Sequence, residues 1–270
     1  MVIPDLLTEW LTYSTLGAAA GFLAGLLGVG GGLIIVPVLT FAFTALHFPA
    51  SHVVHLALGT SLATILFTSI SSLRAHHAHG AVNWRIWRGI TPGIVTGTLA
   101  GSVLAASLSS VFLKGFFVVF LFYVGTQMLL DIRPKGSREL PGRAGLFLAG
   151  NVIGIVSSLV GIGGGTLSVP FMTWCNVKLH EAIGTSAAIG LPIAAAGAVG
   201  YAVNGLRIAD LPPGSFGFVY LPALAAIVLV SVLTAPLGAR LAHRLPVKKL
   251  KRIFALLLYA LGVRMALTLG

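Results

Sequence analysis

Charged residues are scarce in this sequence. Lys, Arg, Asp and Glu make up 9% of the 270 residues, and only six residues are acidic. Ordinary soluble domains carry roughly 25% charged residues. Hydrophobic residues reach 57% here, and the mean hydropathy is +1.00. The composition therefore excludes a soluble globular protein and predicts an integral membrane protein.

The sequence has a single cysteine and none of the common catalytic motifs. Cys175 is the single cysteine, which excludes an intrachain disulfide, and we expect it to be a packing residue. The sequence holds no Ser-His-Asp set, Walker motif or paired intramembrane carboxylates, so we expect no enzymatic activity, ATP hydrolysis or cofactor. His76, His77 and His79 lie in a basic loop without nearby Cys, Asp or Glu, so no metal site is predicted.

The sequence contains several long apolar runs. Several reach the roughly 20 residues that a helix needs to cross a bilayer. No alternation typical of a membrane β-barrel is present, so we predict an all-α membrane protein. The expected spans lie near residues 51–73, 88–108, 113–130, 181–203, 216–240 and 249–268.

The chain contains an internal repeat. GVGGGLIIVP at residues 28–37 recurs as GIGGGTLSVP at residues 161–170, a separation of 161 minus 28, or 133. We call residues 28–32 and 161–165 the first and second glycine runs. HLALGTS at 55–61 recurs as HEAIGTS at 180–186, separated by 180 minus 55, or 125, and four positions near the ends of the halves repeat at 137. The repeat predicts one transmembrane domain built from residues 1–135 and 136–270, a construction common in secondary transporters.

Basic residues indicate how the chain is oriented. If each glycine run is the tip of a helical hairpin that returns to its starting side, all the basic clusters lie on the cytoplasmic side and both termini lie outside. The two repeats then have inverted topology, each with a glycine-tipped hairpin, broken or re-entrant, and three transmembrane helices. Eight to ten helical segments fit this pattern. The basic clusters are Arg74, Arg85 and Arg88; Arg133, Lys135, Arg138 and Arg143; and Arg240, Arg244, Lys248, Lys249, Lys251 and Arg252.

The glycine runs are candidate anion sites. Glycine removes side chains from the approach of a ligand, and a helix that starts after each run would offer unsatisfied amides and a positive dipole end. The alternative is close helix packing. With the repeated Pro37 and Pro170, we favour broken helices over straight packing helices. The candidate residues are Gly30, Gly31, Gly32, Gly163, Gly164, Gly165 and Thr166.

The repeated GTS motifs add hydroxyl groups. Thr60, Ser61, Thr185 and Ser186 are candidate ligands, although such hydroxyls also bond to their own helix backbone. His55 and His180 precede the motifs at the same spacing and are candidates for proton coupling, with polar packing as the alternative.

The motifs GLLGVGGGLIIVP, LALGTS, HGAVNWR, GIGGGTLSVP and AIGTS resemble those of the TauE/SafE family of sulfite exporter-like membrane permeases. The resemblance covers almost the entire chain. It implies a multi-pass transporter of the bacterial inner membrane that moves sulfite, sulfoacetate or a related organosulfonate, mostly outward.

We therefore expect a secondary transporter whose partners are a small anion and the bilayer. The net charge of +11 lies in short loops between spans, which argues against a nucleic-acid partner. An anion channel and a non-transporting scaffold are the alternatives. The sequence leaves open whether the protein is a monomer or a homodimer.

Overall fold

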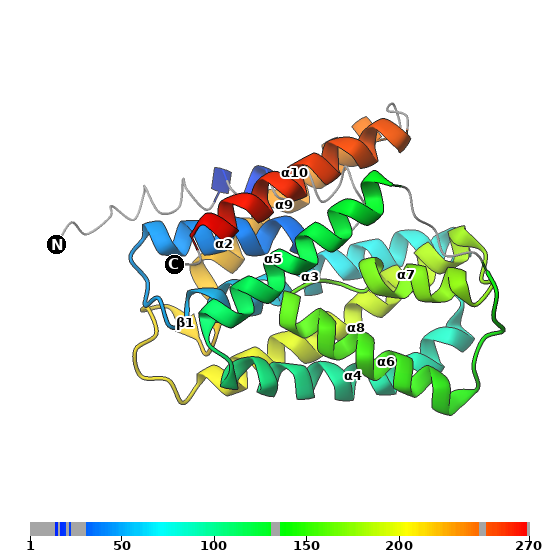
Figure 1. The fold of residues 1–270 in the computed structure, drawn as a ribbon, viewed down its shortest axis with the longest axis horizontal. Coiled ribbons are helices and arrows are strands. Elements are labelled where there is room, and N and C mark those ends of the chain that lie inside the picture. The colour runs from blue at the N-terminus through cyan, green and yellow to red at the C-terminus, as the bar shows by residue number, and fades with distance from the viewer. Residues whose placement is uncertain are drawn as a thin grey trace.

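The computed structural model describes residues 14–15, 17–19, 22, 31–130, 136–242 and 247–268, and the description is confined to them. These residues are mostly helical (Figure 1). A two-stranded antiparallel pair, which the sequence did not predict, precedes α9. The elements are α2 (Gly32–Ala45), α3 (Val53–Ala78), α4 (Trp84–Ser107), α5 (Ser110–Leu129), α6 (Arg143–Val160), α7 (Gly165–Trp174), α8 (Leu179–Gly205), β1 (Ser215–Phe216), β2 (Val219–Tyr220), α9 (Leu221–Ala242) and α10 (Val247–Leu267).

Five of these helices, α3, α4, α5, α6 and α8, are long and apolar enough to cross a bilayer. Four of them match the spans predicted near 51–73, 88–108, 113–130 and 181–203 to within about five residues at each end. Helices α9 and α10 match the last two predicted spans equally well. The helical limb expected before the first glycine run falls largely outside the described residues.

Side chains define where two of the helices begin. The Asn83 Oδ1 atom accepts hydrogen bonds from the amides of Arg85 and Ile86, both at 3.1 Å. The Ser109 Oγ atom accepts one from the amide of Phe112 at 3.2 Å. These caps satisfy amides that have no partner inside the helix. They fix the turns that reverse the chain before α4 and before α5.

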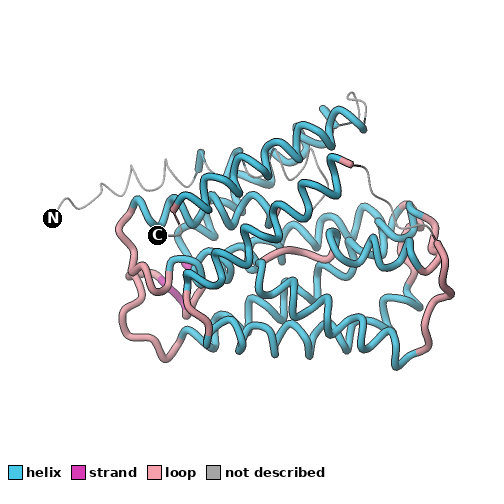
Figure 2. The backbone as a smooth tube through the Cα atoms, in the orientation of Figure 1, coloured by secondary structure: helices cyan, strands magenta, loops and turns pink. Residues whose placement is uncertain are grey.

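The second glycine run interrupts the helical chain. Helix α6 ends at Val160, Gly161 follows in the left-handed conformation with φ +60°, and α7 begins at Gly165. Figure 2 shows this connection as a loop in the middle of the molecule, whereas other loops lie at the two ends. Helix α7 has 10 residues and is about 15 Å long, half the roughly 30 Å of a bilayer core. It continues through Pro170, so the glycines, and not the proline, end the preceding helix.

Helices α4 and α6 pack with their backbones in contact. A Cβ atom on Gly93 would lie 2.0 Å from the Phe147 carbonyl oxygen, and one on Gly97 would lie 2.3 Å from that of Asn151. Gly154 approaches α4 in the same way, with its Cβ position 2.5 Å from a carbonyl oxygen. Only glycine fits such positions, which is the small-residue packing expected between helices in a membrane. The contacts advance in the same direction along both helices, so α4 and α6 are parallel and begin at the same end.

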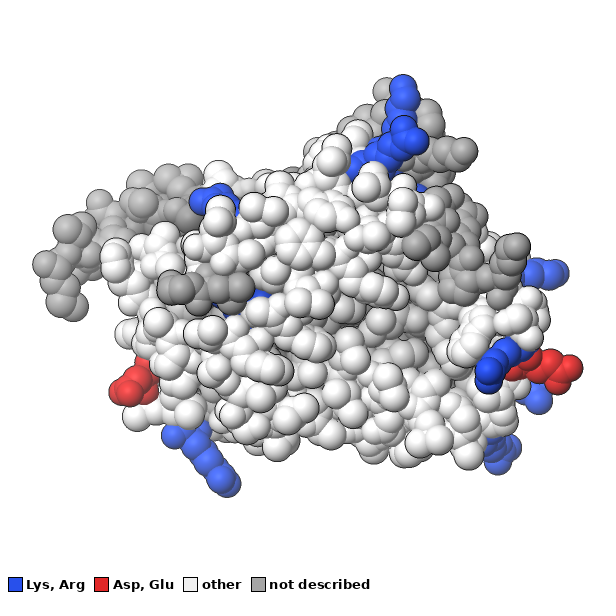
Figure 3. All heavy atoms as spheres, in the orientation of Figure 1, with Lys and Arg blue, Asp and Glu red and all other residues white. Residues whose placement is uncertain are grey.

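Charge is concentrated at the ends of the molecule. Figure 3 shows a broad, nearly uncharged face, with most Lys and Arg side chains toward the right-hand end. Arg85 and Arg88 of α4 line one cavity together with Arg143 of α6. Residues from two of the three basic clusters therefore meet at this end, and α10 begins at the same end (Figure 1).

Candidate functional site

The second glycine run ends in a helix N-terminus whose first amides have no acceptor among the described residues. Gly164 is the N-cap of α7, and no side chain caps this helix. The Ser168 amide donates to the Gly164 carbonyl at 3.0 Å, whereas the amides of Gly165, Thr166 and Leu167 make no hydrogen bond with any described residue. A helix N-terminus also carries about half a positive charge. These donors suit an anion.

Two predicted hydroxyl groups stand beside this N-terminus without partners. Thr166 Oγ1, in the first turn of α7, is buried and unpaired, and its residue is 9% exposed. The Ser186 side chain, on α8, is buried and makes no hydrogen bond with a described residue. A Cβ atom on Gly165 would lie 3.7 Å from Ser186 Oγ. Thr166 and Ser186 are thus brought together with the free amides.

Ser69 of α3 is a third hydroxyl that the sequence did not single out. Its side chain is buried and makes no hydrogen bond with a described residue. A Cβ atom on Gly190 of α8 would lie 3.0 Å from Ser69 Oγ and 3.8 Å from the Gly164 amide nitrogen. The repeat gave no signal for Ser69, because Ala194 stands at the equivalent position, 125 residues later.

The glycines of this run differ in the space around them. A Cβ atom on Gly163 would meet only Ile65 at 3.5 Å, and one on Gly165 only Ser186 at 3.7 Å, both ordinary contacts. A Cβ atom on Gly164 would lie 2.9 Å from the Ser186 carbonyl oxygen and the Ile189 side chain. Room for an added atom is therefore found at Gly163 and Gly165, whereas Gly164 is packed against α8.

The first glycine run packs against the second. Gly31 adopts φ +77° as the N-cap of α2, a conformation that favours glycine. A Cβ atom on Gly32 would lie 2.6 Å from the Gly161 carbonyl oxygen and 2.9 Å from Ile162 Cα. The start of α2 thus touches the turn that precedes α7. Gly30 lies outside the described residues.

Ser61 stabilises the same turn. Its Oγ atom donates a hydrogen bond to the Gly161 carbonyl oxygen at 2.8 Å, and its side chain is fully buried. This hydroxyl satisfies the last turn of α6, whose carbonyls have no partner inside the helix. Ser61 therefore supports the second glycine run, whereas its repeat counterpart Ser186 stands free beside α7.

Thr60 and Thr185 make the same contact at two places. The Tyr220 amide donates to Thr60 Oγ1 at 2.9 Å, and the Asn83 amide donates to Thr185 Oγ1 at 2.8 Å. Thr185 follows Thr60 by 125 residues, and Tyr220 follows Asn83 by 137, which are the spacings of the sequence repeat. We call these hydrogen bonds the Thr60 latch and the Thr185 latch. Each joins a GTS motif to the residue before a helix of the other predicted repeat.

The glycine of each GTS motif allows this approach. A Cβ atom on Gly59 would lie 2.2 Å from the Phe218 carbonyl oxygen, and one on Gly184 would lie 2.3 Å from that of Ala81. A larger residue would push the loop away and break the neighbouring latch. The recurrence of Gly-Thr in both motifs is therefore accounted for by packing between the predicted repeats.

The two candidate proton-coupling histidines have different surroundings. His55 is buried, and its Nε2 atom lies 3.0 Å from the Ala105 carbonyl oxygen and 3.1 Å from that of Leu108. Its Nδ1 atom lies 3.3 Å from Ser110 Oγ. His55 thus holds the turn between α4 and α5, whereas His180 is exposed in the first turn of α8. Neither lies among the free donors of α7.

The histidine-rich end of α3 is occupied by packing contacts. His77 meets the Trp84 ring edge-on with centroids 5.4 Å apart, and His79 Nδ1 lies 2.7 Å from the Ala75 carbonyl oxygen. Within the described ranges, no three His, Cys, Asp or Glu side chains are grouped to hold a metal ion.

Known proteins are similar to this sequence over nearly its whole length. The family model described as Sulfite exporter TauE/SafE matches residues 13–265. A probable membrane transporter protein of Haemophilus influenzae is 37% identical over 253 residues, covering 93% of this chain and 96% of the relative. A probable membrane transporter protein of Methanocaldococcus jannaschii is 26% identical, and the match covers 93% of each chain. The probable membrane transporter protein YdhB of Bacillus subtilis is also 26% identical, over 86% of this chain and 89% of the relative.

No solved structure matches the chain. The family model nevertheless spans the five apolar helices and the glycine runs, and the relatives are named as membrane transporters. The chain is a membrane transporter protein that belongs to the TauE/SafE sulfite exporter family.

Proposed function

We propose that this protein is a secondary transporter that exports a small oxyanion, namely sulfite or an organosulfonate such as sulfoacetate, across the bacterial inner membrane. The observation that carries this proposal is the N-terminus of α7, where amides from Gly165 to Leu167 and the Thr166 hydroxyl have no partner in the described part of the chain. Buried donors without acceptors are costly, so a ligand that accepts from them is favoured. The name of the matching family supports sulfite.

The chemistry of the site fits a sulfite or sulfonate group. Such a group presents three oxygens, and the donors come from three helices, namely the amides and Thr166 of α7, Ser186 of α8 and Ser69 of α3. No Lys or Arg side chain is among these groups. Neutral donors and a helix dipole hold an anion less firmly than a full ion pair does, which allows the ligand to be released on the other side.

The two latches support a transporter built from inverted repeats. In our proposal residues 1–135 and 136–270 form two repeats of opposite orientation, each with a glycine-tipped hairpin and three further helices. The Thr60 and Thr185 latches lie at equivalent positions of these repeats and cross from one to the other. Inverted repeats would place one latch toward each side of the membrane. Opening one latch while the other stays closed gives alternating access to the site between them.

The basic end of the molecule supports the orientation. Arg85, Arg88 and Arg143 lie at that end, so the positive-inside rule makes it the cytoplasmic end. Under the proposed topology both termini are periplasmic.

The test is binding and counterflow of labelled sulfite, sulfoacetate, sulfate and chloride by the purified protein in liposomes. Gly165→Ala is the informative variant, because its methyl group makes no clash within the protein but occupies the space beside Ser186. We expect it to weaken sulfite or sulfonate binding at least tenfold. Gly115→Ala is the control, because nothing lies within 4 Å of that Cβ position. Equal saturable counterflow by both variants would refute the site, and flux without saturable counterflow would indicate a channel.

Thr166→Val separates ligand binding from packing. Removing a neutral hydrogen bond to the ligand costs about 0.5–1.5 kcal/mol, which is roughly a 2- to 12-fold loss of affinity. The ligand-free protein should become more stable to heat, because valine replaces a buried hydroxyl that has no partner. A gain in stability with unchanged affinity would show that Thr166 does not contact the ligand.

A further inference from the structure

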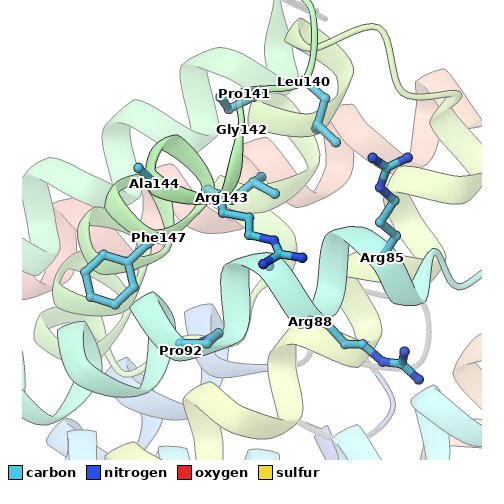
Figure 4. Close-up of a pocket in the computed structure, with 11 residues that line it drawn as sticks. Arg85, Arg88, Pro92, Leu140, Pro141, Gly142, Arg143, Ala144 and Phe147 are labelled. Carbon is cyan, nitrogen blue, oxygen red and sulfur yellow. The ribbon is translucent and has the colours of Figure 1, made fainter.

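A cavity at the basic end of the molecule is not used by the proposed transport site. It has a volume of about 1020 Å³ and lies where α4 and α6 begin. Arg85, Arg88 and Arg143 line it together with apolar residues that include Leu140 and Phe147. Figure 4 shows Arg85 extending toward Leu140, Arg143 extending toward α4, and Arg88 extending outward.

The three guanidinium groups have no counterion among the described residues. None makes an ion pair or a side-chain hydrogen bond with another described residue, and all three residues are exposed. Three like charges that line one cavity repel one another unless an anion compensates them. The cavity therefore carries a positive charge that is not needed for any contact within the described part of the chain.

The start of α6 adds donors to the same place. Gly142 is its N-cap, no side chain caps the helix, and the amides of Arg143, Ala144 and Gly145 make no hydrogen bond with a described residue. Helix α4, in contrast, begins with its amides bonded to Asn83. A free helix N-terminus beside arginines is a favourable position for a phosphate group.

The surface that continues from the cavity is apolar. Along α6, next to Phe147 of the cavity lining, Leu148 is 64% exposed and Val152 is 62% exposed. Such side chains on a membrane-crossing pair of helices face acyl chains. The close glycine packing of α4 against α6 keeps the basic cavity and this apolar surface in a fixed relation. A ligand that matches both must have an anionic head and a hydrocarbon tail.

We infer that this cavity binds an anionic phospholipid, with the headgroup phosphate held by Arg85, Arg143 and the α6 amides and the acyl chains lying along α4 and α6. Arg88 contributes at the outer rim. The mixed lining favours a lipid over a free anion, because a soluble phosphate would leave the apolar wall unused. Basic cavities between membrane helices on the cytoplasmic side are places where anionic headgroups bind. The inference is independent of the transported substrate.

The test measures binding of phosphatidylglycerol and phosphatidylcholine to the full-length protein in mild detergent by native mass spectrometry. We expect the wild-type protein to prefer phosphatidylglycerol. Replacing Arg85, Arg88 and Arg143 with Gln should lower the phosphatidylglycerol affinity by about fivefold for each arginine and leave phosphatidylcholine binding unchanged. The control replaces Arg74, Lys178 and Arg207 with Gln, which removes the same charge from exposed positions outside the cavity.

Several outcomes would overturn the inference. A wild-type protein without preference for phosphatidylglycerol would do so even if the triple variant failed to fold. Equal loss in the control variant would reduce the effect to net charge. Displacement of the lipid by millimolar glycerol phosphate, with similar affinity for both, would show that the site takes a soluble phosphate and not a lipid.

Discussion

The two latches predict reciprocal behaviour at the two ends of the molecule. Thr60→Val removes the acceptor of the Tyr220 amide, and Thr185→Val removes that of the Asn83 amide. Each change leaves a backbone amide without its partner, which costs about 1–3 kcal/mol, or roughly 5- to 150-fold in an equilibrium between closed and open states. If the protein alternates, weakening one latch shifts the population toward the state in which the other latch is closed.

Hydrogen–deuterium exchange of the protein in nanodiscs measures both ends at once. In Thr60→Val we expect faster exchange of the peptide around Tyr220 and slower exchange of the peptide around Asn83. In Thr185→Val we expect the converse. A protein that merely loses packing would exchange faster near the substitution without any slowing at the far end.

Thr64→Val is the matched control for this experiment. Thr64 is also fully buried on α3, but its hydroxyl donates to the Thr60 carbonyl oxygen of its own helix at 2.8 Å. Its loss removes no bond between the predicted repeats, so both peptides should exchange as in the wild-type protein. If neither latch variant slowed exchange at the opposite end, the reasoning that links the latches to alternating access would be refuted.

Two further predictions concern packing. Gly97→Ala should lower the midpoint of thermal unfolding by about 2–12 °C, because its methyl group would lie 2.3 Å from the Asn151 carbonyl oxygen. Gly115→Ala should leave the midpoint unchanged, and equal midpoints for the two variants would contradict the backbone contact of α4 with α6. Burial raises the pKa of the Cys175 thiol, and the Arg138 guanidinium only partly opposes this. Maleimide should therefore modify Cys175 at pH 7 about tenfold more slowly than an exposed cysteine introduced by Ala144→Cys. The rate at Cys175 should rise with pH as the thiolate forms, and equal rates for the two cysteines at pH 7 would refute the burial of Cys175 as a packing residue.

The helices could be predicted from the sequence because their physical cause is local. Runs of apolar residues long enough to cross a bilayer have few alternatives to a helix, since the backbone must bond to itself in lipid. The boundaries shifted where side chains cap the helices, as Asn83 does when α4 begins several residues before the expected span at residues 88–108. The strands β1 and β2 were missed because two residues each are too short for a periodic pattern.

The candidate site was predictable only where the repeat signalled it. The repeat drew attention to Thr60, Thr185, Ser61 and Ser186 alike, but spacing cannot distinguish a hydroxyl that bonds to a neighbouring backbone from one that is free. Three of these four hydroxyls hold loops or turns in the structure, and the fourth, that of Ser186, makes no hydrogen bond with a described residue. Ser69 could not be found from the repeat, because its role depends on where α3 crosses α8.

The two glycine runs are similar in sequence, but the helices that follow them differ in chemistry, and the difference bears on how an anion would be held. At a separation of 133, Leu33 and Ile35 of α2 stand where Thr166 and Ser168 stand in α7. Both α2 residues are buried apolar side chains. The N-terminus of α2 therefore offers amides without hydroxyls, whereas α7 offers both. In the proposed site an anion would therefore rest on the polar tip of α7, and the apolar start of α2 would add no side-chain donor. Neutral donors on one helix would hold such an anion without a full ion pair, which suits a carrier that must bind its substrate on one side and release it on the other.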